Sequence, residues 1–282
     1  EGEGENTMSK RAVIGLFIAF SATLLPVASS AAEYNLPWER FNVQAGVFFA
    51  SLSDKVTVGG EGAGVAIDVE QFLGLKATNT VFRLGAMYRI GERRRSRVDL
   101  TYFYFNRSGN KTIGQDITVD NTVIRSGSNV DTTFNFQILK GAYSYSFFQD
   151  DRMDLAASIG LFVMPIKFDI SATGAGGTSA DLKFTAPLPT IGLRGDFAIT
   201  PKVFLRMNVD FFYLEYQNFK GSLVDSNFAL EYNPWNHFGF GVGLENFRMK
   251  LEAQGKDYPS LNFEGVVKMQ FIGAQLYARY FF

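Results

Sequence analysis

The sequence has 282 residues, of which 27 are basic and 28 are acidic, and it contains no cysteine. The balanced charge gives no indication of a nucleic-acid partner. The lack of cysteine excludes disulfides, thiolate chemistry and the acylated cysteine of a bacterial lipoprotein. The 29 Phe, 12 Tyr and 28 Gly residues favour β-strands joined by tight turns over helices.

The N-terminal part of the chain is predicted to lie outside the folded domain. Residues 1–7 precede the first methionine and are interpreted as upstream translation or a cloning remnant. Two basic residues, an apolar run over 12–25 and a stretch of small residues then follow, which is the pattern of a cleavable export signal over 8–32. The apolar run is shorter than the ~20 residues of a membrane-spanning helix. The mature chain is therefore expected to be one domain, 33–282.

Apolar residues recur at every second position along this domain. In 203–213 the odd positions are all apolar or aromatic, whereas the even positions include Arg206, Asn208 and Asp210. A period of two is that of a β-strand with two different faces. The same alternation occurs in 82–90, 97–104, 191–197 and 238–245.

The length of the alternating segments favours a membrane barrel over a soluble sandwich. Segments such as 130–148 and 152–171 far exceed the five or six residues typical of globular strands. Tilted membrane-spanning strands need about 9–11 residues and can continue above the bilayer. The apolar face is then expected to contact lipid and the charged face to line the lumen. A closed ring also leaves no unpaired strand edge in hydrocarbon.

The connections alternate in length, which fixes the topology. Short polar turns at 91–96, 149–152, 200–202 and 233–236 alternate with mostly longer loops at 56–79, 108–129, 172–180, 218–221 and 253–260. Outer-membrane barrels have short periplasmic turns and longer extracellular loops. We therefore predict an all-β, transmembrane, antiparallel up-and-down β-barrel of about ten strands. The expected strands are 40–55, 80–90, 97–107, 130–148, 152–171, 181–198, 202–217, 222–233, 236–252 and 261–282.

Two features leave alternatives open. Segments 63–72 and 112–126 also have strand character, and they either extend hairpins above the membrane or raise the count to twelve. The apolar face changes parity near Leu139 and again near Pro165. A β-bulge would cause such a change, and so would passage of the strand from the lipid zone into an extracellular extension.

The last strand carries a resemblance to a known class of proteins. It reads FIGAQLYARYFF and ends on an aromatic residue, with Leu276, Tyr280 and Phe282 on its outward face. This pattern resembles the signal that the barrel-assembly machinery recognises in Gram-negative outer-membrane proteins. The blocks RLGAMYRI–GERRRSRVDLTYFYFNRSG and YSYSFFQDDR–MDLAASIGLF are similar to those of an uncharacterised class of small barrels. The resemblance implies a bacterial outer-membrane location, reached after export, with assembly machinery, lipids and lipopolysaccharide as partners.

Aromatic girdles are expected where such a barrel crosses the two membrane interfaces. The sequence offers Trp38, Phe103, Tyr216, Trp235 and Tyr280 for them.

The sequence contains no recognisable catalytic constellation. Outer-membrane lipid-modifying enzymes use a Ser–His pair and omptin proteases use acidic residues with a His, but the single histidine, His237, is predicted at the periplasmic end. One histidine without cysteine does not form a metal site, so we expect no catalytic residues, cofactor or metal. The acidic residues Asp54, Glu61, Asp68 and Glu70 could bind Ca²⁺ weakly, but a solvated loop is the preferred interpretation.

Ten charged residues are predicted to point into the lumen. They either form a paired network that fills a narrow barrel or line a water-filled pore with mild anion preference, because Arg outnumbers Asp and Glu among them. A barrel of eight strands is just filled by its side chains, and true porins use sixteen or more strands. The predicted ten strands lie near the filled limit, which favours the narrow or plugged lumen. The ten residues are Arg83, Arg89, Arg97, Asp99, Arg194, Asp196, Arg206, Asp210, Glu245 and Arg279.

Three functions remain open from the sequence. The preferred one is a non-enzymatic outer-membrane barrel, either structural or a small passive channel for small solutes. The second is an adhesin or receptor that binds an unspecified extracellular ligand through loops 56–79 and 108–129. The third is a lipid-modifying or proteolytic enzyme that depends on His237.

Overall fold

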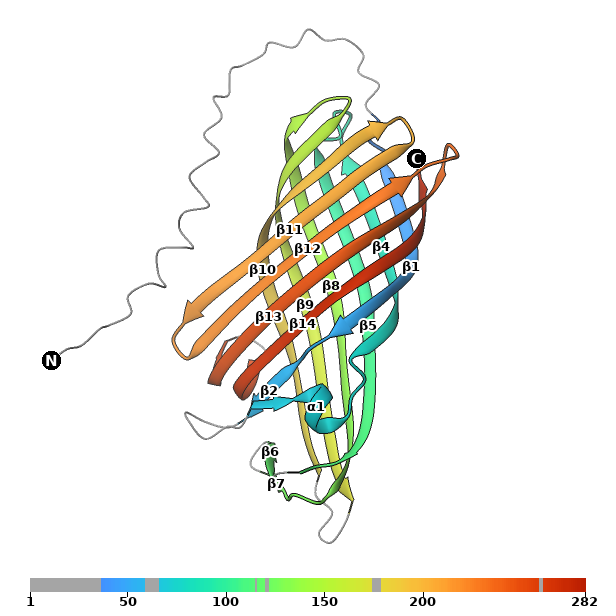
Figure 1. The fold of residues 1–282 in the computed structure, drawn as a ribbon. Helices are drawn as coiled ribbons and strands as arrows, with labels where there is room; N and C mark the ends of the chain where they lie inside the picture. The colour runs from blue at the N-terminus through green and yellow to red at the C-terminus, as the bar shows by residue number, and fades with distance from the viewer. Residues whose placement is uncertain (1–36, 59–65, 115, 120–121, 174–178, 259–260) are drawn as a thin grey trace, which may run out of the picture. The chain divides into compact units, whose positions relative to one another are not determined.

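The computed structural model describes residues 37–282 except 59–65, 115, 120–121, 174–178 and 259–260, and it forms a closed antiparallel β-barrel (Figure 1). β1 (Phe41–Leu52) pairs with β4 (Thr78–Ile90) on one side and with β14 (Leu261–Phe281) on the other, which closes the ring. The predicted ten-stranded barrel is confirmed. Its other strands are β5 (Ser96–Thr112), β8 (Asn129–Gln149), β9 (Met153–Thr173), β10 (Ser179–Thr200), β11 (Val203–Tyr216), β12 (Phe219–Tyr232) and β13 (Phe238–Tyr258).

The predictions for 1–7 and for the export signal over 8–32 fall outside the described residues. Within the part that is described, no helix is long and apolar enough to span a membrane.

Segments 63–72 and 112–126, which could have raised the strand count to twelve, form short elements at one end of the barrel. β2 (Lys55–Val58) pairs with β14, and β3 (Ala66–Asp68) pairs with β2, outside the ten-stranded ring. β6 (Ile117–Val119) and β7 (Thr122–Ile124) pair only with each other. The twelve-stranded alternative is therefore wrong, because these strands extend the loops rather than widen the barrel.

Between β3 and β4 lies the short helix α1 (Val69–Leu73). The Asp68 carboxylate caps its start by accepting a hydrogen bond of 2.8 Å from the Gln71 amide. Gly74, at φ +71°, ends it in the left-handed conformation that glycine adopts without strain.

The two ends of the barrel differ in their connections. The short turns lie at the end where the chain terminates, which we call the turn end (Figure 1). The helix α1 and strands β2, β3, β6 and β7 lie at the opposite end, which we call the cap end (Figure 1). The predicted alternation of short turns and longer loops is thus present.

The two faces of the strands exchange character at one level of the barrel. On β9 the even positions point inward along the whole strand, and they change from polar or small residues such as Asp154 to apolar residues from Phe162 onward. The outward positions change in the opposite sense, from exposed Ile159 and Leu161 to Lys167. The barrel is therefore polar inside and apolar outside toward the turn end, and the reverse toward the cap end.

This exchange explains the change of parity in the sequence. The β9–β10 register runs without a shift past Pro165, and on β8 the inward positions stay even on both sides of Leu139. A bulge is therefore not the cause at either position. The strands pass from one environment into another, which is the second of the two predicted explanations.

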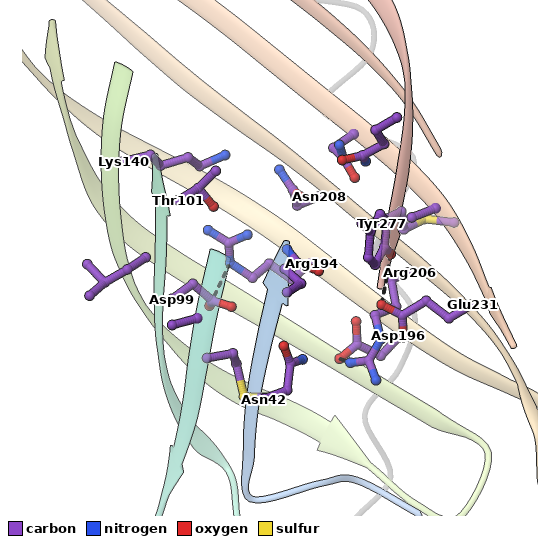
Figure 2. Close-up of a pocket in the computed structure, with 18 of the residues that line it drawn as sticks. Asn42, Asp99, Thr101, Lys140, Arg194, Asp196, Arg206, Asn208, Glu231 and Tyr277 are labelled. Atoms are coloured by element: carbon purple, nitrogen blue, oxygen red, sulfur yellow. Dashed lines mark hydrogen bonds and ion pairs between the residues drawn. The ribbon is translucent and has the colours of Figure 1, made fainter. Parts of the chain in front are cut away.

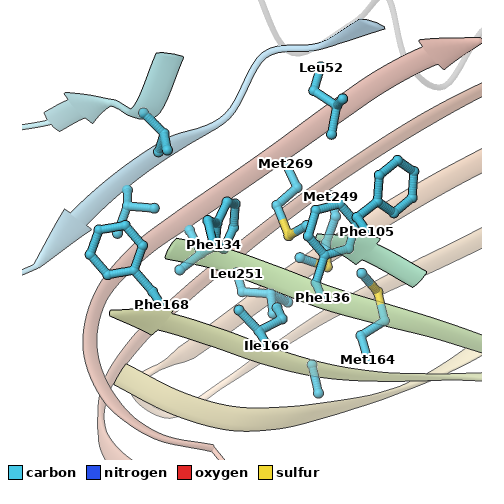
Figure 3. Close-up of a cluster of buried hydrophobic side chains, with 14 of the residues drawn as sticks. Leu52, Phe105, Phe134, Phe136, Met164, Ile166, Phe168, Met249, Leu251 and Met269 are labelled. Carbon is cyan, nitrogen blue, oxygen red and sulfur yellow. The ribbon is translucent and has the colours of Figure 1, made fainter. Parts of the chain in front are cut away.

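The apolar inner half, which we call the aromatic layer, is packed with phenylalanine rings (Figure 3). The rings of Phe105 and Phe136 stack with centroids 4.5 Å apart, and those of Phe247 and Phe271 stack at 4.7 Å. Apolar residues of the cap end, such as Leu73 in α1, belong to the same buried cluster. Loops 56–79 and 108–129 thus contribute side chains to the core of the barrel.

Two of the five residues proposed for the interfacial girdles lie in the interior instead. Phe103 is buried in the aromatic layer, and Trp38 is buried at the turn end, where its indole N–H donates 2.9 Å to the Asp150 carbonyl. Phe103 has the inward parity of β5, and Trp38 precedes β1 and folds into the mouth of the barrel. The remaining three, Tyr216, Trp235 and Tyr280, are exposed, and Tyr216 lies at the hairpin end of β11.

Candidate functional site

The polar inner half of the barrel, which we call the ionic layer, is the candidate functional site. The structure places all ten predicted lumen residues on the inner face, and each of them takes part in an ion pair. Figure 2 shows some of them, among them Asp99, Arg194, Asp196 and Arg206. Five further charged residues take part that the sequence analysis did not select. They are Glu39, Lys140, Asp154, Asp225 and Glu231.

One group of ion pairs lies near the turn end and centres on Arg206. Its guanidinium contacts Glu39 at 2.7 Å, Glu231 at 2.5 Å and Asp196 at 3.2 Å. Arg279 pairs with the same two glutamates from β14. Burial alone would raise the pKa of the Glu39 carboxyl, but Arg206 and Arg279 hold that pKa well below its usual range. Glu39 is therefore a charged anchor that ties the segment before β1 into the barrel mouth.

Asp196 joins this group to the neighbouring strands. It accepts hydrogen bonds from Arg89 at 2.8 Å and from Arg97 at 2.7 Å, and Arg89 also pairs with Asp154. The Arg89 guanidinium lies 5.7 Å from the centre of the Trp38 ring, a cation–π contact that closes the turn-end mouth from inside.

A second group lies deeper, against the aromatic layer. Lys140 Nζ is 2.6 Å from both Asp210 and Asp225, and 4.9 Å from the centre of the Phe162 ring. Arg194 donates 2.8 Å to the Ser144 hydroxyl and lies 3.5 Å from Asp210. Lys140 therefore marks the boundary between the two layers.

The charges of the ionic layer are nearly balanced. Seven basic residues face eight acidic ones in the ion pairs of this half, because four of the five additional residues are acidic. The excess of Arg on which the predicted anion preference depended is therefore absent among the described residues.

A small polar cavity lies between these groups. It has a volume of about 100 Å³ and is bordered by Arg83, Asp99, Arg194, Asn208 and Tyr277, among others (Figure 2). A space of this size can hold several water molecules. Gly241 makes room beside it, because a β-carbon there would lie 2.2 Å from Cζ of Tyr277. The Tyr277 hydroxyl donates 2.9 Å to Glu231.

The acidic residues near the cap end are not a solvated loop. Asp54 is buried, and its carboxylate lies 2.5 Å from the Arg107 guanidinium, which also pairs with Glu70. Burial raises the pKa of Asp54 to about 7, against the opposing effect of Arg107. Asp68 caps α1, and Glu61 lies outside the described residues. The solvated-loop interpretation is wrong for Asp54 and Glu70, whose partner comes from a distant strand.

His237 lies at the turn end, as predicted. It is exposed, and its Nδ1 is 3.0 Å from the Phe281 carbonyl oxygen. The three residues of the predicted assembly signal, Leu276, Tyr280 and Phe282, are exposed on the outer surface near the C-terminus.

Solved structures resemble the fold of this chain, although their sequence identity to it is low. No family model and no curated protein matches the chain. The outer membrane protease OmpT from Escherichia coli has 13% sequence identity and a TM-score of 0.51, over 86% of this chain and 97% of that one. The fold is that of a bacterial outer-membrane β-barrel.

Two other matches are less similar in structure. The toluene transporter TodX from P. putida has 8% identity and a TM-score of 0.37, over 88% of this chain and 93% of that one. The outer membrane protein OprG from Pseudomonas aeruginosa has 11% identity and a TM-score of 0.34, over 88% and 99%.

Proposed function

We propose that this chain is an integral protein of the bacterial outer membrane, reached after export, that acts as a non-enzymatic barrel sealed against water and ions. Its turn end faces the periplasm and its cap end faces the outside. The proposal is supported by the outer surface and by the two layers that fill the interior.

The outer surface carries a band suited to lipid. On β13 the outward residues near the turn end are apolar, such as Val242 and Leu244, and they give way to Arg248 and Lys250 toward the cap end. Tyr232 and Trp235 are exposed at the turn-end margin of the band, and Tyr104 and Tyr213 at its other margin. Aromatic belts at both margins are typical of membrane barrels.

The interior supports a sealed barrel because two unlike barriers lie in series. An ion would first have to enter the paired groups of the ionic layer, whose charges already satisfy one another. It would then meet the aromatic layer, where stacked rings leave an apolar path that dewets and excludes ions. The observation that carries the proposal is that the interior is filled by the ionic layer toward the turn end and by the aromatic layer toward the cap end.

Planar-bilayer recording tests the seal. We expect the purified mature chain to insert without steady conductance, and we expect the triple variant Phe105→Ala, Phe136→Ala, Phe271→Ala to conduct. Flotation with vesicles checks that both proteins insert. Steady conductance of the parent protein in the nanosiemens range would refute the sealed barrel.

The non-enzymatic part of the proposal is supported by the placement of His237. It lies on the exposed turn-end rim, away from the cap-end region where Asp54 and Glu70 are already paired with Arg107. Membranes containing the protein should hydrolyse phospholipid, lipid A and peptides no faster than control membranes. An activity that appears with the protein and disappears in His237→Ala would contradict this.

A further inference from the structure

Three lysines lie opposite one another on the outer face of the barrel near the cap end, and we call them the lysine row. In the strand register Lys55 of β2 faces Lys268 of β14, and Lys268 faces Lys250 of β13. Figure 1 shows β2 beside the cap-end part of β14. Lys55 and Lys268 are exposed, and Lys250 is partly exposed. Like charges directly opposite in neighbouring strands destabilise a sheet, so strand pairing alone does not account for the row.

The protein neutralises little of the positive charge of the lysine row. Lys250 pairs with Glu252 at 2.8 Å, but neither Lys55 nor Lys268 has an ion pair among the described residues. Asp68 of β3 lies opposite Lys55, but its carboxylate accepts the hydrogen bond that caps α1. Two exposed ammonium groups therefore face each other without a counter-charge from the chain.

The lysine row borders a groove of about 440 Å³ on the outer side of the wall. Every polar side chain that lines this groove can donate a hydrogen bond. Besides the row itself, they are Ser53, Ser222, Arg248 and Gln270. No acidic residue lines the groove in the part of the chain that the structure describes. Cations and neutral donors without a carboxylate suit an anion that has several acceptor oxygens.

The groove lies just beyond the apolar band of the outer surface. On β14, Ile272 is exposed in the band, and Lys268 is four residues nearer the cap end. On β13 the same spacing separates Leu244 from Arg248. Four residues cover about 13 Å along a strand, which is about 10 Å along the membrane normal at the usual strand tilt. A lipid whose head lies in the groove would therefore place its acyl chains on the band.

We propose that the lysine row and its groove bind the phosphate monoester head of a lipid of the outer leaflet. Such a head carries about two negative charges and three acceptor oxygens, which match the two unneutralised lysines and the donors beside them. β2 pairs with β14 over only four residues, so a phosphate that contacts both strands fastens β2, and the cap that continues from it, to the wall. The inference goes beyond the proposed function and rests on its placement of the cap end at the outer leaflet.

A second pair of facing lysines provides a matched control. Lys167 of β9 faces Lys183 of β10 on the outer face, beside another groove of about 390 Å³. Here each lysine pairs at 2.9 Å with an aspartate of its own strand, Asp169 or Asp181. The two sites share the cross-strand lysine pair and differ in whether the chain supplies the counter-charge.

Binding of lipid A to the purified protein in detergent micelles tests the site, with native mass spectrometry to measure the bound fraction. Lys55→Gln with Lys268→Gln should weaken binding about tenfold or more, which corresponds to the loss of one charged hydrogen bond. Lys167→Gln with Lys183→Gln removes the same charge and should leave binding unchanged. Lipid A without its phosphates should bind the parent protein as weakly as intact lipid A binds the first variant. Heat-modifiable migration on gels verifies that each variant is folded.

Hydrogen exchange of the β2 amides measures how firmly the cap is fastened. Lipid A should slow this exchange in the parent protein but not in Lys55→Gln with Lys268→Gln. Without lipid, the same variant should exchange more slowly than the parent, because a like-charge contact has been removed. If the two lysines only stabilised the fold, the variant would exchange faster than the parent, with or without lipid.

The outcomes separate this inference from the proposed function. The inference is refuted if lipid A with and without phosphates protects β2 equally, or if phosphatidylglycerol or inorganic phosphate protects it as well as lipid A does. A cysteine at the exposed cap-end residue Thr112 tests the placement, since the chain has no cysteine of its own. If a membrane-impermeant maleimide labels Thr112→Cys only in opened cells, the cap end does not face outside, and the placement fails whatever the micelles show.

Discussion

Asp54 and Arg107 face each other beneath the cap, with Oδ2 and Nη1 2.5 Å apart and both side chains almost fully buried. The same arginine holds Glu70 of α1 and donates 3.0 Å to the Lys76 carbonyl. One guanidinium therefore fixes the β1–β2 link, the helix and the segment leading to β4. Because Asp54 is also beside Glu70, two carboxylates share one cation, and the attachment of the cap depends on the protonation of Asp54.

We expect the cap to become less stable as pH rises from about 4 to 7. The pKa of Asp54 is raised from its ordinary value of 3.8 to about 7 by burial. In this window the folded protein binds a proton that the unfolded chain has released, so the free energy of unfolding falls with rising pH. Hydrogen exchange of the α1 amides at several pH values measures this. Asp54→Asn should remove the dependence, and the exposed change Asp131→Asn should leave it intact; an unaltered slope in Asp54→Asn would contradict the assignment.

Replacing Phe105 by Ala should lower the free energy of unfolding by about 3–5 kcal/mol, as is usual for a large aromatic removed from a packed core. Phe105 is fully buried and contacts four other rings, including Phe136 and Phe271. Phe82→Ala is the matched control, because Phe82 is 61% exposed on the outer face, where lipid or detergent refills the space. Urea titration in detergent compares the two. Equal losses would show that the aromatic layer is not a packed core.

Lys140→Met should destabilise the barrel by about 3–5 kcal/mol, because it leaves Asp210 and Asp225 buried without their shared cation. Adding Asp210→Asn and Asp225→Asn should restore most of the loss, since neutral amides need no counter-charge. The control Lys183→Met breaks an exposed pair with Asp181 and should have no measurable effect. Unfolding titrations of the four proteins measure these differences. Failure of the amide changes to rescue Lys140→Met would show that packing of the lysine stem, rather than charge, matters.

The period of two was sufficient to predict the ten strands and the inward side of residues such as Arg194 and Asp210. It could not show that the inner face becomes apolar toward the cap end, because alternation alone does not say which face is inside. The change of parity near Pro165 was the sign of this in the sequence. At that level the inner face changes from polar to apolar residues and the outer face changes from apolar to polar ones. Glu39 was missed because it precedes β1, and the Asp54–Arg107 pair because it joins positions 53 residues apart. Such contacts follow from the closure of the ring and leave no local pattern.

Phe282→Ala should reduce the amount of assembled protein in the outer membrane several-fold while leaving the folded barrel nearly as stable as before. The backbone of Phe282 closes the ring, since its amide donates 3.0 Å to the Phe41 carbonyl and its own carbonyl accepts from the Phe41 amide at 2.9 Å. These bonds survive the substitution, and the ring contact with Phe41, at 5.2 Å between centroids, is the main local loss. A strong effect on assembly must then come from recognition of the terminal aromatic residue.

Phe41→Ala separates recognition from packing, because it removes the same ring contact from the β1 side of the ring closure and leaves the C-terminus intact. Membrane fractionation with heat-modifiable gel migration measures the assembled fraction, and refolding into detergent measures stability without the assembly machinery. We expect Phe41→Ala to assemble normally and both variants to refold equally well. If Phe41→Ala lowers assembly as much as Phe282→Ala does, the terminal residue acts through packing, and the predicted assembly signal of Leu276, Tyr280 and Phe282 is not one.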